Sequence, residues 1–226
     1  MKFLIVGALG RMGREVVAAA KDDGDDVVGL DIKSAKIGDI LVYDDVSKLP
    51  KNVDVIIDFS TATDRRKLID FAVKNKIAYG LFSTAISKDD EKQFKKASKN
   101  ISILMCQNAS VGVNLLYKMT DFLSKNMKAA DVVLTEYHHK QKKDIPSGTA
   151  KNIEKILTEN GINFTTGAYR VANEKGYHKV EFFMGDEIVM ISHRANSRKI
   201  FAVGAIEAAK KLKNKPSGQY FDILNL

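Results

Sequence analysis

Short apolar runs alternate with amphipathic stretches along the first half of the chain. The runs are too short for helices and are rich in valine and isoleucine, so they predict buried strands. The expected strands are 2–6, 26–31, 53–59, 77–81 and 101–105, and the expected helices between them are 15–21, 63–74 and 88–98. Strands that alternate with helices are typical of an α/β fold, in which helices cover both faces of a doubly wound parallel sheet.

The pattern changes after residue 109. A helix that ends near residue 127 leads into a β-branched run, which predicts a strand, and a second helix follows. Three strand patterns then come in succession without long helices between them. The expected strands are 131–135, 164–171, 179–184 and 187–193, and the expected helices are 147–160 and 199–213, with a short closing segment at 220–224. This succession predicts a second, α+β domain with an open mixed sheet.

Composition limits the class of protein. With 226 residues and 45% hydrophobic residues, the chain has enough apolar side chains for one large or two small domain cores. The opening MKFLIVGALG is interrupted by glycines before it reaches the length of a signal peptide's apolar region or a membrane span. A single cysteine excludes an intrachain disulfide and a cysteine-based metal site, so we expect a cytoplasmic protein.

The net charge of +8 narrows the choice of partners. It arises from 36 Lys and Arg residues against 28 Asp and Glu residues. These basic residues are spread over most of the predicted helices, without interleaved aromatic residues or a nucleic-acid-binding motif. A small anionic metabolite therefore explains the charge better than nucleic acid or a membrane surface.

A glycine-rich turn follows the first strand. Gly7, Gly10 and Gly13 have the spacing GxxGxxG, and Asp31 ends the second strand. Glycines permit a close approach to a pyrophosphate, a helix N-terminus supports its charge, and a carboxylate accepts from a ribose hydroxyl. The turn therefore predicts a Rossmann-like dinucleotide site, although a merely tight turn is the alternative. Lys33 lies close enough in sequence to bind a 2′-phosphate, so both NADH and NADPH stay open.

Other polar groups follow the remaining strands of the predicted sheet. In an open parallel sheet, the loops at the carboxyl ends of the strands line the ligand crevice. Ordinary helix caps are the alternative explanation for the Ser and Thr residues. The candidate cofactor-side residues from these loops are Ser60, Phe82, Ser83, Thr84, Cys106, Asn108 and Ala109.

The segment 136–150, EYHHKQKKDIPSGTA, has the densest chemistry of the chain. His138 and His139 stand where a strand gives way to a loop, and three lysines follow within the next four residues. Histidine titrates near neutral pH and suits proton transfer, whereas clustered lysines suit an anion. Neither histidine needs a metal for this role.

A helix begins at the end of the same segment. Pro146 ends the extended part and Ser147 is the expected N-cap, so the backbone N–H groups of Gly148 and Thr149 should have no intrahelical partner. Such a terminus attracts carboxylate or phosphate. The alternatives are a surface histidine pair, a solvated lysine loop and an ordinary helix start. Together the three signals favour protonation and capture of a small polyanion.

Five segments resemble the dihydrodipicolinate reductase family, nearly from end to end. They are GALGRMGREV at 7–16, DFS at 58–60, NASVGVN at 108–114, the histidine segment at 136–150, and SHRANSRKIFAVGA at 192–205. The histidine motif is highly specific to that family, whereas the glycine motif is not.

The resemblance implies roles for individual residues. His138 matches the family's proton donor, Lys142 its catalytic lysine and His139 a substrate contact. Gly148 and Thr149 match the amide pair that holds a substrate carboxylate. The positions that match the family's cofactor site are Gly7, Gly10, Arg11, Met12 and Asp31.

The resemblance also implies a reaction and an assembly. NADH or NADPH reduces 4-hydroxy-tetrahydrodipicolinate, a small dicarboxylate, in the diaminopimelate route to lysine. Residues 1–109 and 195–226 would form the dinucleotide-binding domain, and 110–194 the domain for substrate binding and oligomerisation, in a homotetramer. The rivals are a related amino-acid or aldehyde dehydrogenase and a non-catalytic NAD-binding regulator.

Three features depart from the family pattern. Residues 82–85, Phe-Ser-Thr-Ala, stand where the family has Gly-Thr-Thr-Gly, so only Ser83 and Thr84 are polar candidates there. Asn108 has the unusual neighbours Gln107 and Ala109. The chain is also shorter than is usual in the family, around residues 169–177.

Overall fold

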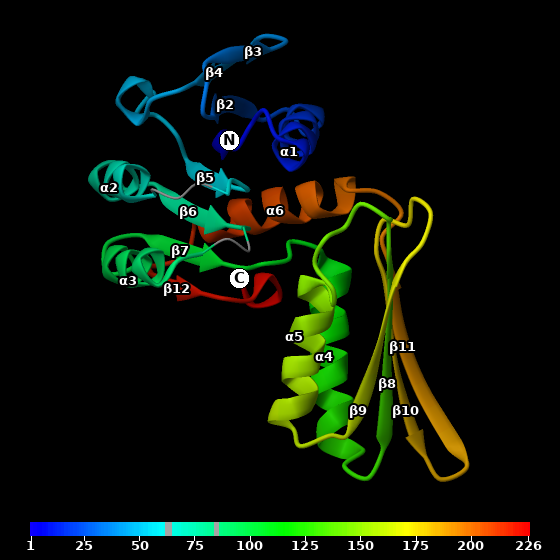
Figure 1. Cartoon of the computed structure of the whole chain (residues 1–226). Coiled ribbons are helices and arrows are strands. Elements are labelled where there is room, and N and C mark those ends of the chain that lie inside the picture. Colours follow the sequence, from blue (N-terminus) through cyan, green and yellow to red (C-terminus); the bar gives the residue numbers. More distant parts are fainter. Residues whose placement is uncertain (62–64, 84–85) are drawn as a thin grey trace. The chain divides into compact units, whose positions relative to one another are not determined.

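The chain forms two compact units in the computed structural model, which describes residues 1–61, 65–83 and 86–226. Unit 1 comprises Met1–Ser110 and Lys199–Leu226, and unit 2 comprises Val111–Arg198 (Figure 1). The C-terminal helix thus belongs to the first unit, although the second unit precedes it in sequence.

Unit 1 is built on a largely parallel sheet. Its five strands expected from the sequence are all present. They are β1 (Lys2–Val6), β2 (Asp26–Leu30), β5 (Val55–Asp58), β6 (Ala78–Leu81) and β7 (Ser102–Met105). Within the described residues the sheet has eight strands, in the order β12-β7-β6-β5-β1-β2-β4-β3. The first strand is central, because Val6 lies opposite both Leu30 of β2 and Asp58 of β5.

Three edge strands were not predicted. A hairpin of β3 (Ala35–Ile37) and β4 (Ile40–Tyr43) extends one edge, and it turns at Gly38 with a positive φ of 61°. At the other edge, β12 (Gly218–Tyr220) pairs in parallel with β7. The expected closing segment 220–224 is therefore the end of a strand followed by a short 3₁₀ helix at Ile223–Asn225. Strands this short show little periodicity in the sequence.

Helices cover both faces of the sheet, as predicted. On one face α1 (Arg11–Asp22) contacts α6 (Lys199–Leu212), and on the other α2 (Arg66–Asn75) contacts α3 (Lys88–Ala97) (Figure 1). The prediction placed the start of α1 four residues too late, because a glycine inside the first turn lowered the helical signal. The predicted start of the second helix, Thr63, lies outside the described residues. Among the helices that the structure describes, none has the length and apolarity to cross a membrane.

Unit 2 contains the mixed sheet that the sequence predicted. Its strands are β8 (Asp131–His138), β9 (Phe164–Arg170), β10 (Tyr177–Met184) and β11 (Glu187–Arg194). Over the described part of the chain they follow the order β11-β10-β8-β9, in which only the β8–β9 pair is parallel. Two helices, α4 (Val111–Asn126) and α5 (Gly148–Glu159), pack together against the sheet (Figure 1).

Large apolar side chains are exposed to solvent on the opposite face of this sheet. Phe183, Ile188, Met190 and Tyr169 are exposed, and Tyr137 stacks on Tyr169 at a centroid distance of 5.1 Å. We call this surface the open face of unit 2. A group of large exposed apolar side chains is typical of an interaction site.

The glycine turn brings helix α1 into close contact with the end of β1. An added Cβ at Gly13 would lie 2.0 Å from the carbonyl oxygen of Gly7 and 2.7 Å from the Cα of Ala8. These neighbours are backbone atoms and cannot move aside as a flexible side chain can. Gly13 is therefore required by packing, although glycine lowers helix propensity.

We expect Gly13→Ala to lower the free energy of unfolding by about 1 to 3 kcal/mol, because overpacking outweighs the roughly 1 kcal/mol that alanine contributes to helix propensity. Urea denaturation measures the difference. Ala18→Ser, on the exposed side of the same helix, is the control and should change stability by less than about 0.5 kcal/mol. A stabilised Gly13→Ala protein would contradict the packing argument.

Candidate functional site

The predicted cofactor residues lie at the carboxyl ends of neighbouring strands of unit 1. This edge results from the strand order β7-β6-β5-β1-β2, all parallel. The residues follow β1 (Gly7, Gly10, Arg11, Met12), β2 (Asp31, Lys33), β5 (Ser60), β6 (Phe82, Ser83) and β7 (Cys106, Asn108, Ala109). The remaining candidate, Thr84, is outside the described residues.

The turn between β1 and α1 has the geometry of an anion cradle. Gly7 adopts a φ of 77°, which favours glycine, and the N–H of Gly10 donates to its carbonyl at 3.0 Å. Gly10 is the N-cap of α1 and offers no capping side chain, which leaves the helix N-terminus to an anion. Asp31 accepts from the N–H of Leu9 at 2.8 Å, so the end of β2 is tied to this turn. These residues fit a dinucleotide pyrophosphate and ribose.

Several of the candidate side chains on this edge are buried, among them Phe82 and Cys106. The ring of Phe82 stacks on Phe59, with centroids 5.3 Å apart. The thiol of Cys106 donates to the carbonyl of Asn108 at 3.1 Å, and burial raises its pKa. The cysteine is therefore a poor nucleophile, and Phe82 contributes packing rather than a polar contact.

A buried ionic network lies beneath the loops at this edge. Arg65 donates to Asp58 at 3.0 Å and to Asp90 at 3.2 Å, and Tyr79 donates to Asp58 at 2.7 Å. Arg65 also binds the carbonyl of Ser60 at 3.0 Å. Because buried charges are stable only when they are paired, this network fixes the end of β5 relative to α2 and α3.

In unit 2, strand alternation separates the two adjacent histidines. Burial along β8 alternates, so Glu136 and His138 lie on the buried face that α5 contacts, whereas His139 follows the strand and is half-buried. The strand register then adds two partners. His178 of β10 lies opposite Glu136, and Arg170 of β9 lies opposite His138.

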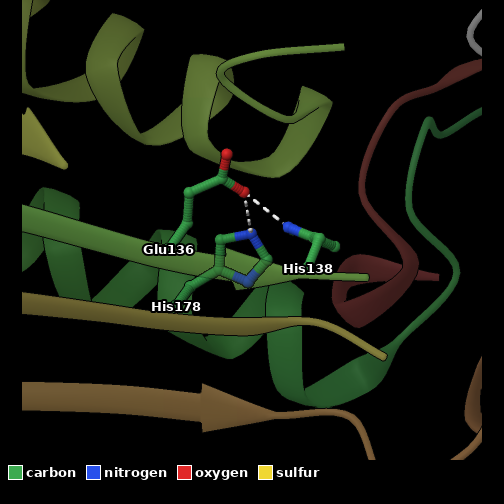
Figure 2. A group of neighbouring side chains, drawn as sticks. All are labelled: Glu136, His138 and His178. Atoms are coloured by element: carbon green, nitrogen blue, oxygen red, sulfur yellow. Dashed lines mark ion pairs between the residues drawn. The ribbon is translucent and has the colours of Figure 1, made fainter. Parts of the chain in front are cut away.

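A fully buried carboxylate is the centre of this cluster. Oε2 of Glu136 lies 2.6 Å from Nδ1 of His138. A dashed line marks this ion pair in Figure 2. Oε1 accepts from the backbone N–H of Ser147 at 3.0 Å and from both terminal nitrogens of Arg170 at 3.1 Å. Burial would raise the pKa of Glu136, but hydrogen bonds from His138 and Ser147 lower it to about 2. Glu136 is therefore ionised at neutral pH.

The second buried histidine is neutral. Burial, with a contribution from the charge of His138, lowers the pKa of His178 to about 3. Its Nε2 lies 3.1 Å from the hydroxyl of Ser147 and 3.8 Å from Oε2 of Glu136. The ring of His178 also meets that of His138 edge-on, at a centroid distance of 5.1 Å.

Glu136, His138 and His178 resemble a metal-binding triad, since one ligand atom of each lies within 4.8 Å of the others. Two ligands of one tetrahedral zinc ion are separated by about 3.3 Å, because each bond is about 2.0 to 2.1 Å long. The 2.6 Å contact between Glu136 and His138 is shorter than that, and it has the length of a charge-assisted hydrogen bond. The distance is therefore that of a direct ion pair.

The lysine loop ends at the N-terminus of α5, where the sequence predicted it. Ser147 caps the helix by accepting from the N–H of Ala150 at 3.2 Å, and Gly148 and Thr149 open the first turn. Lys142 is 24% exposed and pairs with Asp144 at 2.9 Å. Lys140 and Lys143 are exposed. The loop thus holds one partly shielded ammonium group near the helix terminus and two in solvent.

Arg170 also ties down this loop. Its guanidinium donates to the carbonyls of Lys142, Asp144 and Tyr169 in addition to Glu136. One side chain thus connects β9, the buried carboxylate and both ends of the Lys142–Asp144 segment.

The sequence analysis assigned no role to Glu136, Arg170 or His178. For Glu136 a signal existed, since a residue two positions before His138 on a strand faces the same side. For Arg170 and His178 the contacts depend on long-range register, which single-sequence periodicity does not contain.

The lowered pKa values of two buried groups, His178 and Glu136, predict that the protein loses stability in acid. The pKa of His178 is about 6.5 in the unfolded chain and about 3 in the folded protein, so the unfolded chain takes up this proton first as the pH falls. The pKa of Glu136 is likewise lower in the folded protein, at about 2 instead of its ordinary 4.5. The unfolded chain binds more protons across this range, so stability falls as the pH falls. We expect a loss of about 3 kcal/mol from His178 between pH 7 and pH 4.

Urea denaturation at a series of pH values measures this loss, with His178→Gln as the comparison. The variant should show a visibly flatter dependence on pH, because glutamine does not titrate. Parallel curves for the two proteins would contradict the assignment of a neutral, buried His178.

Comparison with known proteins identifies the family. The family model described as dihydrodipicolinate reductase, N-terminus, matches residues 1–109, and the model for the C-terminus matches residues 112–226. Among solved structures, a dipicolinate-bound dihydrodipicolinate reductase from Paenisporosarcina sp. TG-14 is similar, with a TM-score of 0.81 at 16% identity, covering 100% of this chain and 99% of that one. Aspartate semialdehyde dehydrogenase II from Vibrio cholerae has a TM-score of 0.57 at 12% identity, covering 93% and 97%. At these identities the structures show a shared fold.

Curated relatives match over nearly their whole length. The chain is 34% identical to 4-hydroxy-tetrahydrodipicolinate reductase of Aquifex aeolicus, with 100% of this chain and 99% of the relative covered. It is 32% identical to that of Clostridium tetani (97% and 94% covered) and 30% identical to that of Natronomonas pharaonis (97% and 98% covered). With both family models matched and these relatives aligned almost end to end, the chain belongs to the dihydrodipicolinate reductase family.

Proposed function

We propose that this protein reduces 4-hydroxy-tetrahydrodipicolinate to tetrahydrodipicolinate with NADH or NADPH, in the diaminopimelate route to lysine. The observation that carries the proposal is the site of unit 2. There a histidine paired with an ionised carboxylate lies in the same segment as a partly shielded lysine and a helix N-terminus. A proton donor and two anion-binding groups are what reduction of a conjugated dicarboxylate requires.

Unit 1 is the proposed dinucleotide-binding domain. Gly7, Gly10 and the N-terminus of α1 would hold the pyrophosphate, and Asp31 would accept from the ribose. When bound, the reduced nicotinamide supplies a hydride. Lys33 is exposed beyond the end of β2, so it can neutralise the 2′-phosphate of NADPH, while Asp31 favours the free hydroxyl of NADH.

Unit 2 is the proposed substrate domain. His138 donates the proton, and Lys142 with the backbone N–H groups of Gly148 and Thr149 holds a substrate carboxylate, with His139 as a further contact. A lysine and a helix terminus stabilise negative charge most strongly where water is scarce. The partial burial of Lys142 supports its role over that of its two neighbours.

The proposed assembly is a cytoplasmic homotetramer. The open face of unit 2 supports association, because it exposes a group of large apolar side chains.

An aldehyde dehydrogenase of the same plan would need a reactive cysteine. The only cysteine of the chain, Cys106, is buried with a raised pKa, which argues against that rival.

The decisive test is the oxidation of NADH or NADPH by the pure protein with freshly prepared substrate, followed at 340 nm. We expect steady turnover by the wild type and a loss of kcat of at least about a hundredfold in His138→Gln, with little change in the dissociation constant of the dinucleotide. Equal losses in turnover and dinucleotide binding would indicate a structural histidine. Dinucleotide binding without turnover by the wild type would support the regulator instead.

The three lysines of the loop allow a matched comparison. We expect Lys142→Ala to lower kcat/KM roughly a hundredfold or more, because it removes a specific anion contact of about 2 to 4 kcal/mol. Lys140→Ala and Lys143→Ala should change kcat/KM less than about fivefold, since exposed charges contribute little and are screened by salt. Equal losses that disappear in added salt would show that the loop is only an electrostatic funnel.

A further inference from the structure

The imidazole of His138 has two nitrogens, and the surroundings of the two differ. Nδ1 lies 2.6 Å from Oε2 of Glu136 in an ion-pair contact, and no other group of the described residues makes a hydrogen bond with either atom. Nε2 lies against the backbone of Gly176, where an added Cβ would be 3.1 Å away. Gly176 has a φ of 148°, so both its conformation and this contact favour glycine. Within the described part of the chain, no side chain makes a hydrogen bond or an ion pair with Nε2.

We propose that Glu136 is a positioning residue for His138: it holds the proton on Nδ1 and so makes Nε2 the nitrogen that delivers a proton to the substrate. This inference rests on the proposed function. In the transfer, the Nε2–H bond breaks and its electron pair stays on Nε2, while the new bond forms between that proton and the substrate. Neutral His138 is left with its remaining proton on Nδ1, hydrogen-bonded to the carboxylate.

The partners of Glu136 keep it suited to this role. Its other oxygen is held by the N–H of Ser147 and by Arg170, so the carboxylate cannot rotate away from His138 without losing contacts from two elements. Its pKa of about 2 means that it remains an acceptor throughout the neutral range. A fixed acceptor selects one tautomer of the histidine that faces it.

Other titratable groups also lie near His138. His178 from β10 is neutral, so beside the imidazolium it adds no repulsion. His139 and Lys142 from the following loop interact with this cluster, and Arg170 from β9 acts through Glu136. Among these groups, Glu136 is the one that contacts a ring nitrogen of His138 at hydrogen-bond distance.

Nitrogen NMR of protein labelled with ¹⁵N-histidine tests the tautomer without any need for activity. The chain has four histidines, and single His→Gln variants assign their signals. We expect neutral His138 to carry its proton on Nδ1 in the wild type. In Glu136→Gln the amide group can donate to Nδ1, so the Nε2–H form should appear. An Nε2–H tautomer in the wild type would overturn the inference, whether or not the protein is a reductase.

Kinetics then test the consequence. We expect Glu136→Gln to lower kcat at least about thirtyfold with KM within about threefold, and to move the basic limb of the pH profile to lower pH, because the imidazolium loses its counter-charge. Glu136→Asp keeps the charge and should restore that limb. Glu159→Gln removes one charge at the other end of α5, where Glu159 pairs with Lys155, and should leave kcat within about twofold.

The outcomes separate the two proposals. A wild type without turnover but with the Nδ1–H tautomer would refute the reductase function and leave the positioning geometry standing. An active wild type whose Glu136→Gln variant keeps its kcat and pH profile would refute the positioning role alone. If Glu136→Gln does not fold, two measurements still test the positioning role. They are the tautomer of His138 in the wild type and the basic limb of the pH profile of Glu136→Asp.

Discussion

Burial of one carboxylate, Glu136, is the constraint on which unit 2 depends. Moving an ionised group out of water costs several kcal/mol unless hydrogen bonds and opposite charge replace the lost hydration. Here the replacement comes from the turn before α5, from β9 and from His138 on the same strand. The parallel pairing of β8 with β9 is what brings Arg170 to this point. His138, the lysine loop and the start of α5 are thus fixed by the need to satisfy a single charge.

Unit 1 uses the same principle at its own functional edge. Asp58 ends β5 and is fully buried, and Arg65 and Tyr79 donate to the same oxygen of its carboxylate. The other oxygen accepts from the N–H of Ser60 at 2.7 Å, which orients the loop that follows the strand. In both units a buried carboxylate near the end of a strand fixes the backbone that bears candidate ligand contacts, and an arginine from another element is among its partners.

The sequence predicted those features of the fold that short stretches of residues determine on their own. Apolar runs predicted the parallel strands, and glycine spacing predicted the tight turn after the first of them. Pro146 and Ser147 predicted the start of α5. Each of these features depends on residues that are close together in the sequence. The β3–β4 hairpin was too short to show a period. The pairing of Arg170 with Glu136 depends on register between strands that a helix separates, so no local signal contains it. The family resemblance selected Lys142 among three lysines, whereas the charge pattern alone treats them as equal.

Burial also explains why two ion pairs of unit 2, Glu136 with Arg170 and Asp144 with Lys142, differ in strength. Glu136 is inaccessible to water and its contact with Arg170 is reinforced by backbone groups, so breaking it would leave a buried charge uncompensated, at about 3 to 5 kcal/mol. Asp144 is 47% exposed, and its pair with Lys142 resembles surface pairs that contribute at most about 1 kcal/mol. Asp144 also accepts from the backbone N–H of Gly148, so it holds the start of α5 as well as pairing with the lysine. The contact of Arg170 is therefore the costlier of the two to break, and Arg170 is the cation that holds the cluster around Glu136 in shape.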